Sequence, residues 1–324
     1  MDSQKIKYNQ PRNNRFFYYL KGIARDVYPK KLLRLDMDKK ILLTGLSEEV
    51  LMERVDYYNQ LSKPFSCSHD AKLIKDIPIR KSGSMYYYDL MEYARFFPQN
   101  NLIDYLFGDI QFVPEFPSFV KSRPITENNK NSIIFKFCKV RNFKFYNDPI
   151  PFREKNNKVI WRGACHQKHR VAFMEEFFGK SPNIDIGQHN KGKGDGSRRN
   201  PQWQMPFMTI PEQLQNKFIL SIEGNDVATN LKWTMASNSL CIMRKPRFEA
   251  WFMEGRLKAD FHYVEVKDDY SDLEEKISYF IKNPKEAEEI IRNANAYADQ
   301  FKNIQAEDWI SLKIMQKYYK LLQR

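Results

Sequence analysis

From about residue 157 onward, short apolar runs alternate with longer segments in which apolar residues recur at helical spacing. The apolar runs predict strands at Val159–Trp161, Ile184–Ile186, Phe218–Ile222, Leu240–Met243 and Tyr263–Val266. The longer segments predict helices at Lys168–Phe178, Pro211–Lys217, Ala228–Ala236 and Phe248–Gly255, from a capping box Ser271-Asp272-Leu273-Glu274 to about Ile281, and at 284–299 and 306–322. Repeated strand–helix units predict an α/β protein with a parallel sheet covered by helices on both faces.

The first 150 residues follow a less regular pattern. They predict a helix beginning at Ser47, a second around Tyr86–Phe96, and short strands at Ile103–Phe107 and Ile133–Cys138, joined by turn-rich connectors. This change of character predicts an N-terminal domain at 1–152, a C-terminal domain at 153–300, and a final helix at 301–324 that packs back on the N-terminal domain.

The first candidate for chemistry is the turn that follows Val159–Trp161. The run Trp161-Arg162-Gly163-Ala164 passes from a strand through a glycine into a helix that carries Arg170. A helix N-terminus presents backbone N–H groups and the positive end of its dipole, so this arrangement predicts a phosphate site. Arg162 would add positive charge there, or it would form a structural ion pair.

A second apolar strand ends in a similar turn, Glu223-Gly224-Asn225-Asp226-Val227-Ala228-Thr229-Asn230, followed by Lys232. For either turn alone, ordinary helix capping by Asn and Asp is the simpler explanation. In a parallel sheet, however, both turns lie at the carboxyl ends of strands, where ligands bind. Together they favour a nucleotide held from two sides.

The net charge of +13 indicates an anionic partner, such as nucleic acid, an anionic bilayer or a phosphorylated substrate. The segment Phe16–Arg25 mixes aromatic and basic residues and fits either a helix on a membrane surface or a basic helix packed on the domain by its aromatic face. Signatures of nucleic-acid-binding motifs are missing from the sequence, which argues against that class. The sequence also has no long apolar span or signal-peptide pattern, so we expect a cytoplasmic protein, peripheral on the membrane at most.

Metal binding is not expected. The four cysteines are widely spaced, and Cys165, His166 and His169 lack the paired spacing of a zinc site. The triplet Asp36-Met37-Asp38 has the DxD form of metal-dependent glycosyltransferases, but no clear apolar strand precedes it. The glycine-rich basic segment Gly187–Pro201 is interpreted as a loop. It is either a solvated loop, a lid over the nucleotide-bearing donor substrate, or a contact for a phosphorylated acceptor substrate.

The two turn motifs, in this order and spacing, resemble the donor domain of glycosyltransferase family 90. Similarity continues through Trp251-Phe252, His262-Tyr263-Val264-Glu265-Val266 and Tyr270-Ser271-Asp272-Leu273, over roughly residues 100–320. The basic aromatic start is similar to the bacterial lipopolysaccharide branch. The resemblance implies a GT-B fold, with two Rossmann-like domains and an interdomain cleft, in which the N-terminal domain takes the acceptor. It also implies metal-independent, inverting transfer of a hexose or pentose from a UDP-sugar, without a further cofactor, to a glycan or lipid-linked glycan such as lipopolysaccharide core.

The resemblance places the catalytic base on Asp109, in the run Phe107-Gly108-Asp109-Ile110 that leads to Val113-Pro114. By residue type alone Asp109 is a strand-terminating turn residue, and Asp148, Glu115 and Glu223 are reserve candidates for the base. The family's phosphate-binding arginine falls on Arg170. After the glycine, where the family usually has a small polar residue, this sequence has Ala164. The position of the second loop's usual basic residue falls near Asn230. The residues expected to hold the donor are Trp161, Arg162, Gly163, Ala164, Arg170, Glu223, Gly224, Asn225, Asp226, Val227, Ala228, Thr229, Asn230 and Lys232.

Overall fold

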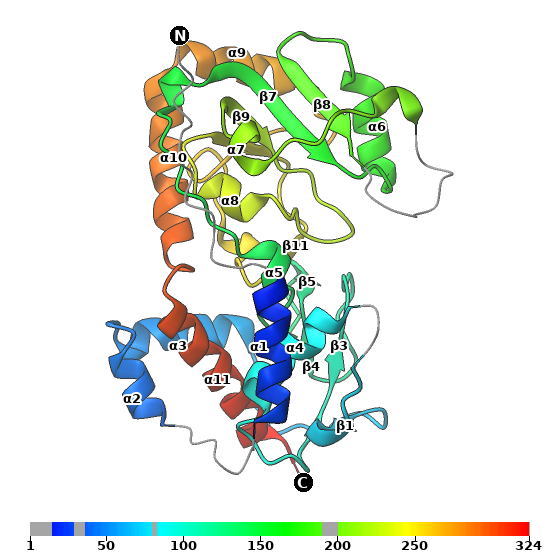
Figure 1. Cartoon of the computed structure of the whole chain (residues 1–324), viewed down its shortest axis with the longest axis vertical. Helices are drawn as coiled ribbons and strands as arrows, with labels where there is room; N and C mark the ends of the chain where they lie inside the picture. The colour runs from blue at the N-terminus through cyan, green and yellow to red at the C-terminus, as the bar shows by residue number, and fades with distance from the viewer. Residues whose placement is uncertain (1–14, 29–35, 80–82, 190–199, 324) are drawn as a thin grey trace. The chain divides into compact units, whose positions relative to one another are not determined.

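The computed structural model describes residues 15–28, 36–79, 83–189 and 200–323 (Figure 1). Most of the segment Gly187–Pro201 therefore lies outside the described residues. The described chain forms two compact units. Unit 1 contains the described residues within Lys144–Pro246 and Arg256–Asp299. Unit 2 contains those within Arg12–Phe143, Arg247–Gly255 and Gln300–Arg324.

Unit 1 is built on a five-stranded sheet whose neighbouring strands all run parallel, in the order β12-β10-β9-β7-β8. Its strands are β7 (Asn156–Gly163), β8 (Ile184–Gln188), β9 (Asn216–Leu220), β10 (Leu240–Met243) and β12 (Val264–Glu265). The chain goes from β7 to β8 on one side and then returns to β9 on the other side. The predicted α/β class and parallel sheet are confirmed, and the β7–β9 pair is a topological switch point, where such sheets bind ligands.

Helices cover both faces of this sheet. They are α6 (Lys168–Phe177), α7 (Ile210–Gln213), α8 (Leu231–Met235), α9 (Leu273–Lys282) and α10 (Pro284–Asp299). Because side chains alternate along a strand, Val159 and Trp161 of β7 enter the core that also holds side chains of α6, α9 and α10. Ile160 instead packs in a second core with Leu214 and Trp233.

Unit 2 combines helices with short strands. Its helices are α1 (Arg15–Val27), α2 (Met37–Leu42), α3 (Glu48–Tyr58), α4 (Ser84–Ala94), α5 (Lys139–Asn142) and α11 (Ile304–Leu321). Its strands are β1 (Lys72–Leu73), β2 (Leu102–Ile103), β3 (Tyr105–Leu106), β4 (Ser118–Val120), β5 (Ser122–Pro124), β6 (Ser132–Ile134) and β11 (Phe248–Ala250). The strands β3, β4 and β6 form a parallel sheet in that order. Buried aromatic residues, among them Phe119, Phe135 and Tyr318, pack against one another in this unit.

Two predictions of local structure are wrong. The segment Phe248–Gly255 is not a helix, because Phe248–Ala250 pairs antiparallel with β5 and the buried Glu249 carboxylate accepts a 2.7 Å hydrogen bond from Arg123. The helix predicted after Ser271 does form as α9, but without the capping box. Its N-cap is Asp272, whose carboxylate accepts the Lys267 N–H instead. None of the described helices is both long and apolar enough to cross a membrane.

Candidate functional site

The switch point of unit 1 brings together the two turns that the sequence singled out. The β7–α6 turn (residues 164–167) follows β7, and the β9–α8 loop (residues 221–230) follows β9. Since β7 and β9 are hydrogen-bonded neighbours with Ile160 opposite Ile219, both connections leave the same edge of the sheet. The structure therefore has the two turns side by side at the carboxyl ends of the strands, as the sequence predicted.

Arg170, in the first turn of α6, joins these two turns through backbone carbonyls. Its Nη1 donates to the Ala164 oxygen at 2.9 Å, which lies in the β7–α6 turn. Its Nη2 and Nε donate to the oxygens of Ile222 and Glu223 at 2.6 and 2.9 Å, in the β9–α8 loop. Burial lowers the pKa of this guanidinium. Because three of the five N–H donors of an arginine are used in this way, Arg170 primarily fixes the geometry of both turns.

Further side chains tie the two turns together. The Nε2 atom of His169 lies 2.8 Å from the same Glu223 carbonyl oxygen, and Gln167 donates to the Asn225 side chain at 3.0 Å. The Asn230 side-chain amide donates to the Leu220 carbonyl at 2.7 Å and so ties the end of the β9–α8 loop to its start. The family usually has a basic residue near this position. Gln167 stands at the N-cap of α6 without a capping hydrogen bond from its own side chain. The edge of the sheet therefore presents a helix N-terminus held rigidly next to a loop.

Gly163 is required by close packing. A Cβ atom at this position would overlap the indole ring of Trp161. At Gly224, by contrast, a Cβ would meet only the Arg170 Nη2 atom at 3.6 Å, an ordinary contact distance. The first glycine therefore lets the backbone pass over the Trp161 ring, whereas the second is not demanded by packing.

Several of the predicted donor-site residues face the interior or another partner. Arg162 forms the structural ion pair, with Nη2 2.6 Å from an Asp185 carboxylate oxygen and Nη1 bound to the carbonyl oxygens of Trp161 and Asp185. The side chains of Trp161, Asp226, Val227, Ala228 and Lys232 are buried. Asn225 and Thr229 are exposed at the loop surface. Because their side chains are buried, these residues are poorly placed to contact a donor with them. Their predicted role in donor binding stays a prediction.

Arg244 is a cation at this edge that the sequence analysis did not identify. It follows β10 directly, is buried, and lies with its guanidinium 5.5 Å from the Tyr270 ring centre. Its Nη2 is 3.8 Å from a Glu223 carboxylate oxygen and its Nη1 is 3.9 Å from an Asp268 carboxylate oxygen, both longer than a hydrogen bond. The buried Nη2 atom makes no hydrogen bond among the described residues. The signal in the sequence is an arginine immediately after an apolar strand, a position at the carboxyl edge.

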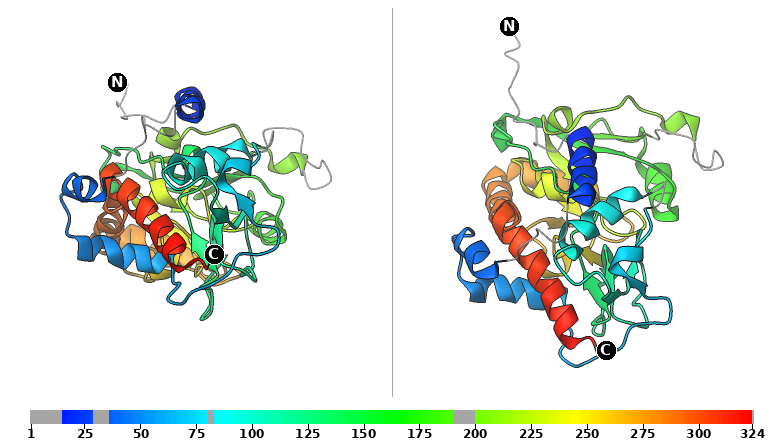
Figure 2. Two further views of the ribbon diagram at one scale, coloured as in Figure 1. Left: turned by 90° about the horizontal axis from the view of Figure 1, so that it is seen from below. Right: turned by 60° about the horizontal axis from the view of Figure 1, so that its bottom comes forward.

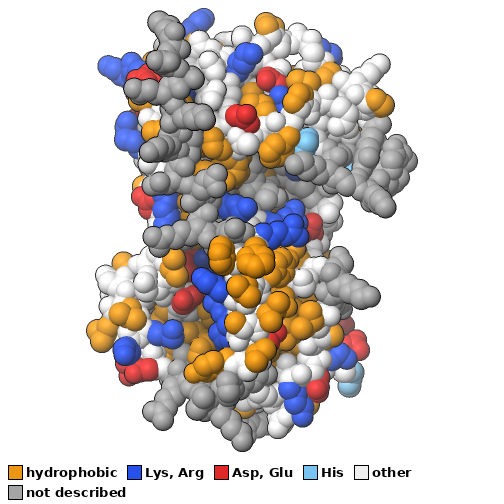
Figure 3. Space-filling model, in the orientation of Figure 1, with side chains coloured by type: hydrophobic (Ala, Val, Ile, Leu, Met, Phe, Trp, Pro, Cys, Tyr) orange, Lys and Arg blue, Asp and Glu red, His pale blue; other side chains and the backbone are white. Residues whose placement is uncertain are grey.

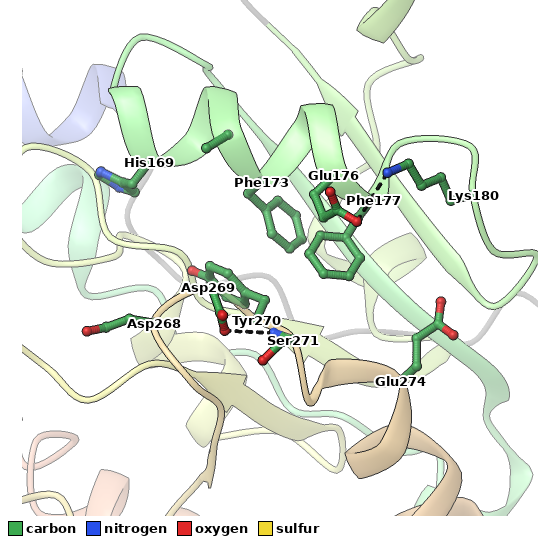
Figure 4. A pocket seen from close by; sticks show the side chains of 11 residues that line it. His169, Phe173, Glu176, Phe177, Lys180, Asp268, Asp269, Tyr270, Ser271 and Glu274 are labelled. Carbon is green, nitrogen blue, oxygen red and sulfur yellow. Dashed lines mark hydrogen bonds and ion pairs between the residues drawn. The ribbon is translucent and has the colours of Figure 1, made fainter.

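A pocket of about 680 Å³ opens beside the two turns, within unit 1 (Figure 4). One wall is α6 together with Lys180 of the following turn, and the other is the segment 268–274 that follows β12. Phe173 and Phe177 on one side and Tyr270 on the other line the pocket, and the rings of Phe173 and Tyr270 pack against each other with their centres 4.7 Å apart. Since His169 both lines the pocket and contacts Glu223, the pocket adjoins the paired turns.

Asp109, the predicted base, belongs to unit 2 and follows Gly108, whose φ of +119° requires glycine. Its carboxylate forms an ion pair with Lys121, and the Asp109 side chain is 36% exposed. A cation therefore lies next to a carboxylate that is partly exposed. The sequence-based role of Asp109 stays a prediction.

The reserve candidates differ in their surroundings. The Asp148 carboxylate is buried and saturated, because it accepts from Lys155 Nζ at 2.7 Å and from the Asn238 N–H at 2.9 Å. It has a structural role. Glu115 is exposed, and Glu223 is half-buried opposite Arg244.

The DxD triplet has a structural explanation. Asp36 is the N-cap of α2 and accepts the Lys39 N–H at 2.9 Å, while Asp38 lies in the first turn of the same helix. Across the residues that the structure describes, no three His, Cys, Asp or Glu side chains are grouped as metal ligands would be. Cys165 is buried, and burial raises the pKa of its thiol to about 11.

Comparison with known proteins identifies the family of the chain. The sequence pattern of glycosyl transferase family 90 matches residues 132–324, which include both turns and Arg244 but not Asp109. The chain is also 48% identical, over 271 residues, to the O-glucosyltransferase LpsA of Dichelobacter nodosus, and the match covers 83% of each protein. The resemblance stated from the sequence is confirmed: the chain belongs to glycosyl transferase family 90 and is a glycosyltransferase.

Proposed function

We propose that the enzyme transfers a sugar from a UDP-sugar to a hydroxyl group of a glycan acceptor, with inversion and without a metal ion. The observation that carries this proposal is the β7–α6 turn locked to the β9–α8 loop by Arg170 at the switch point of a parallel sheet. Ligands of doubly wound sheets bind at this place.

The diphosphate of the donor is proposed to bind at the N-terminus of α6. The side chain of Gln167, the N-cap residue, makes no capping hydrogen bond to α6, so phosphate oxygens would supply acceptors for the first N–H groups of the helix. The N–H donors of Arg170 that do not bind carbonyls, together with Arg244, would compensate the negative charge. Fixed cations and a helix dipole can stabilise departing UDP in the role that a divalent ion has in other transferases.

The nucleoside of the donor is proposed to occupy the pocket next to His169. Phe177, which is half-buried, offers aromatic surface for a planar base, and the buried Phe173 and Tyr270 support it from behind. The carboxylates of Asp268 and Asp269, which line the same pocket, are suited to accept hydrogen bonds from ribose hydroxyls.

Asp109 is proposed to accept the proton of the acceptor hydroxyl. The acceptor oxygen then forms a bond to the anomeric carbon as the bond from that carbon to the UDP oxygen breaks, and UDP leaves with both electrons of the broken bond. Attack from the side opposite UDP inverts the anomeric configuration. The pairing with Lys121 stabilises the carboxylate, so this lysine must release Asp109, or share it, before proton transfer.

Glucose is the sugar to test first, because the Dichelobacter nodosus relative is named an O-glucosyltransferase. Lipopolysaccharide core remains the proposed acceptor class. Metal-dependent transfer is not favoured, because Asp36 of the DxD triplet caps a helix. Nucleic-acid binding is not favoured by any particular observation on the described residues.

The experiment is a panel of UDP-sugars assayed for release of UDP, with UDP binding measured by thermal shift and calorimetry. We expect one donor to be turned over, and UDP to raise the melting temperature in the presence of a chelator. Arg244→Gln should weaken UDP binding about tenfold or more, because it removes a buried cation from the diphosphate site. Asp109→Asn should abolish transfer and leave UDP affinity intact. Binding of none of the UDP-sugars would refute the proposal, and transfer by Asp109→Asn would refute the choice of base.

A further inference from the structure

Helix α1 carries a row of exposed apolar side chains. We define the α1 apolar stripe as Phe17, Leu20, Ile23 and Val27, which recur every three or four residues and therefore share one side of the helix. Their exposed fractions are 55%, 49%, 51% and 78%. In Figure 3 hydrophobic side chains gather over this part of unit 2, next to Lys and Arg side chains.

The orientation of α1 is fixed by its opposite side, which packs on α4. The Tyr18 hydroxyl is hydrogen-bonded to the Asp89 carboxyl group, with 2.7 Å between the two oxygens, and a Cβ atom on Gly22 would lie 2.5 Å from the Tyr88 ring. Figure 2 (left) looks along α1, which lies on the outside of unit 2 next to α4. Because these contacts hold α1 by Tyr18 and Gly22, the helix cannot rotate to bury the α1 apolar stripe against α4.

Charge indicates what covers the stripe. Lys21 is exposed and lies four residues after Phe17, so it borders the stripe. The first forty residues of the sequence contain eleven Lys or Arg and four Asp or Glu, a net +7 out of the +13 of the chain. An apolar stripe bordered by cations is the pattern of a helix that lies in the plane of an anionic membrane surface.

Two other occupants fit less well. A second copy of the chain would bring the same positive charge against α1, which opposes association. A nucleic acid would bind the cations through its phosphates, but neither its phosphates nor its bases make favourable contacts with a row of Leu, Ile and Val side chains.

We propose that the α1 apolar stripe docks this enzyme on an anionic lipid bilayer, with Leu20, Ile23 and Val27 inserted at the level of the headgroups and Lys21 against lipid phosphates. This inference does not depend on the identity of the donor or of the acceptor. It adds a surface of unit 2 to the function of the protein, separate from the paired turns of unit 1.

The test is flotation of the full-length protein with vesicles of phosphatidylcholine, with or without phosphatidylglycerol. We expect binding to the vesicles that contain phosphatidylglycerol, weakened by added salt. The double variant Leu20→Ser/Ile23→Ser should lower the partition coefficient about tenfold or more, since two apolar side chains no longer insert. Lys21→Gln should lower it about fivefold on anionic vesicles and hardly at all on neutral ones.

The matched control is Leu42→Ser/Ile304→Ser, which removes two apolar side chains of unit 2 that are even more exposed, at 82% and 71%. It should bind vesicles like the unaltered protein. Circular dichroism and the melting temperature should be unchanged in both double variants, which separates lost docking from lost folding. Equal binding by both double variants, no binding to anionic vesicles, or a dimer in sedimentation that Leu20→Ser/Ile23→Ser dissociates would overturn the proposal.

Discussion

The Arg170 Nε atom donates a 2.9 Å hydrogen bond to the carbonyl oxygen of Glu223, fifty-three residues further along the chain. With the bonds to Ala164 and Ile222, this contact makes one guanidinium the common support of both turns at the switch point. Arg170 therefore positions the backbone of the proposed donor site. The structure thus extends the sequence-based prediction that this arginine contacts phosphate directly.

Replacing Arg170 by lysine tests this double role. A lysine ammonium cannot reach three carbonyl oxygens that a planar guanidinium spans, so we expect the free energy of unfolding to fall by about 2–4 kcal/mol. The affinity for UDP should fall about tenfold or more. Chemical denaturation and calorimetry measure the two effects. As a control, Arg153→Lys alters an exposed pair with Glu288 and should leave stability almost unchanged. Unchanged UDP affinity in Arg170→Lys and Arg170→Ala would contradict any role at the phosphates.

The two glycines of the turn motifs give a matched pair of variants. Gly163→Ala forces a methyl group against the Trp161 ring, and we expect it to cost about 1–3 kcal/mol of unfolding free energy and to weaken UDP binding. Gly224→Ala meets only an ordinary contact and should change stability by less than about 1 kcal/mol. Urea denaturation of both variants decides the matter. Equal stabilities would mean that the close packing at Gly163 is not maintained in solution.

The buried carboxyl of Asp89 predicts a dependence of stability on pH. Burial raises its pKa to about 7, from an ordinary value near 3.8. If Asp89 carries the proton, it can donate to Tyr18 Oη while the Tyr18 hydroxyl donates to the Met85 carbonyl 3.0 Å away, so that each polar atom is satisfied. Such an acid favours the fold only while it is protonated. Stability should therefore fall as pH rises from about 4 to about 7, by up to about 4 kcal/mol.

Asp89→Asn should remove this dependence, because an amide can reproduce the bonds of the protonated acid: its Oδ1 can accept the Lys139 N–H and its Nδ2 can donate to Tyr18. Denaturation at about pH 5 and about pH 8 compares the two proteins. Asp56→Asn, in an exposed pair with Lys317, serves as the control and should keep the dependence of the unaltered protein. A variant Asp89→Asn with the same slope against pH would contradict the protonation of Asp89.

The cap at Asp36 separates a structural role from a metal site. Asp36→Ala should cost about 1 kcal/mol through loss of the α2 cap and leave the rate of UDP-sugar turnover unchanged. The assay should give the same rate with a chelator as without it. A loss of activity in either condition, restored by manganese, would return the DxD triplet to consideration.

The sequence was sufficient to predict the β7–α6 turn and its pairing with the β9–α8 loop, because alternating strands and helices admit few topologies. It was not sufficient for β11. Phe248 and Ala250 fit either a strand or a helix, and the choice depends on Arg123, which lies 126 residues away and forms a buried pair with Glu249. The sequence also did not predict the hydrogen bonds of Arg170 to carbonyl oxygens. An arginine after a glycine turn indicates an anion-binding role, and nothing in the sequence identifies its backbone partners.

The most direct test of the account is hydrogen exchange of the full-length protein with and without UDP. If the diphosphate binds at the paired turns, amides in residues 163–171 and 221–231 should exchange more slowly with UDP, whereas amides of α2 and of α11 should be unaffected. Protection by UDP that spares both turns, or that appears only in unit 2, would contradict the placement of the donor.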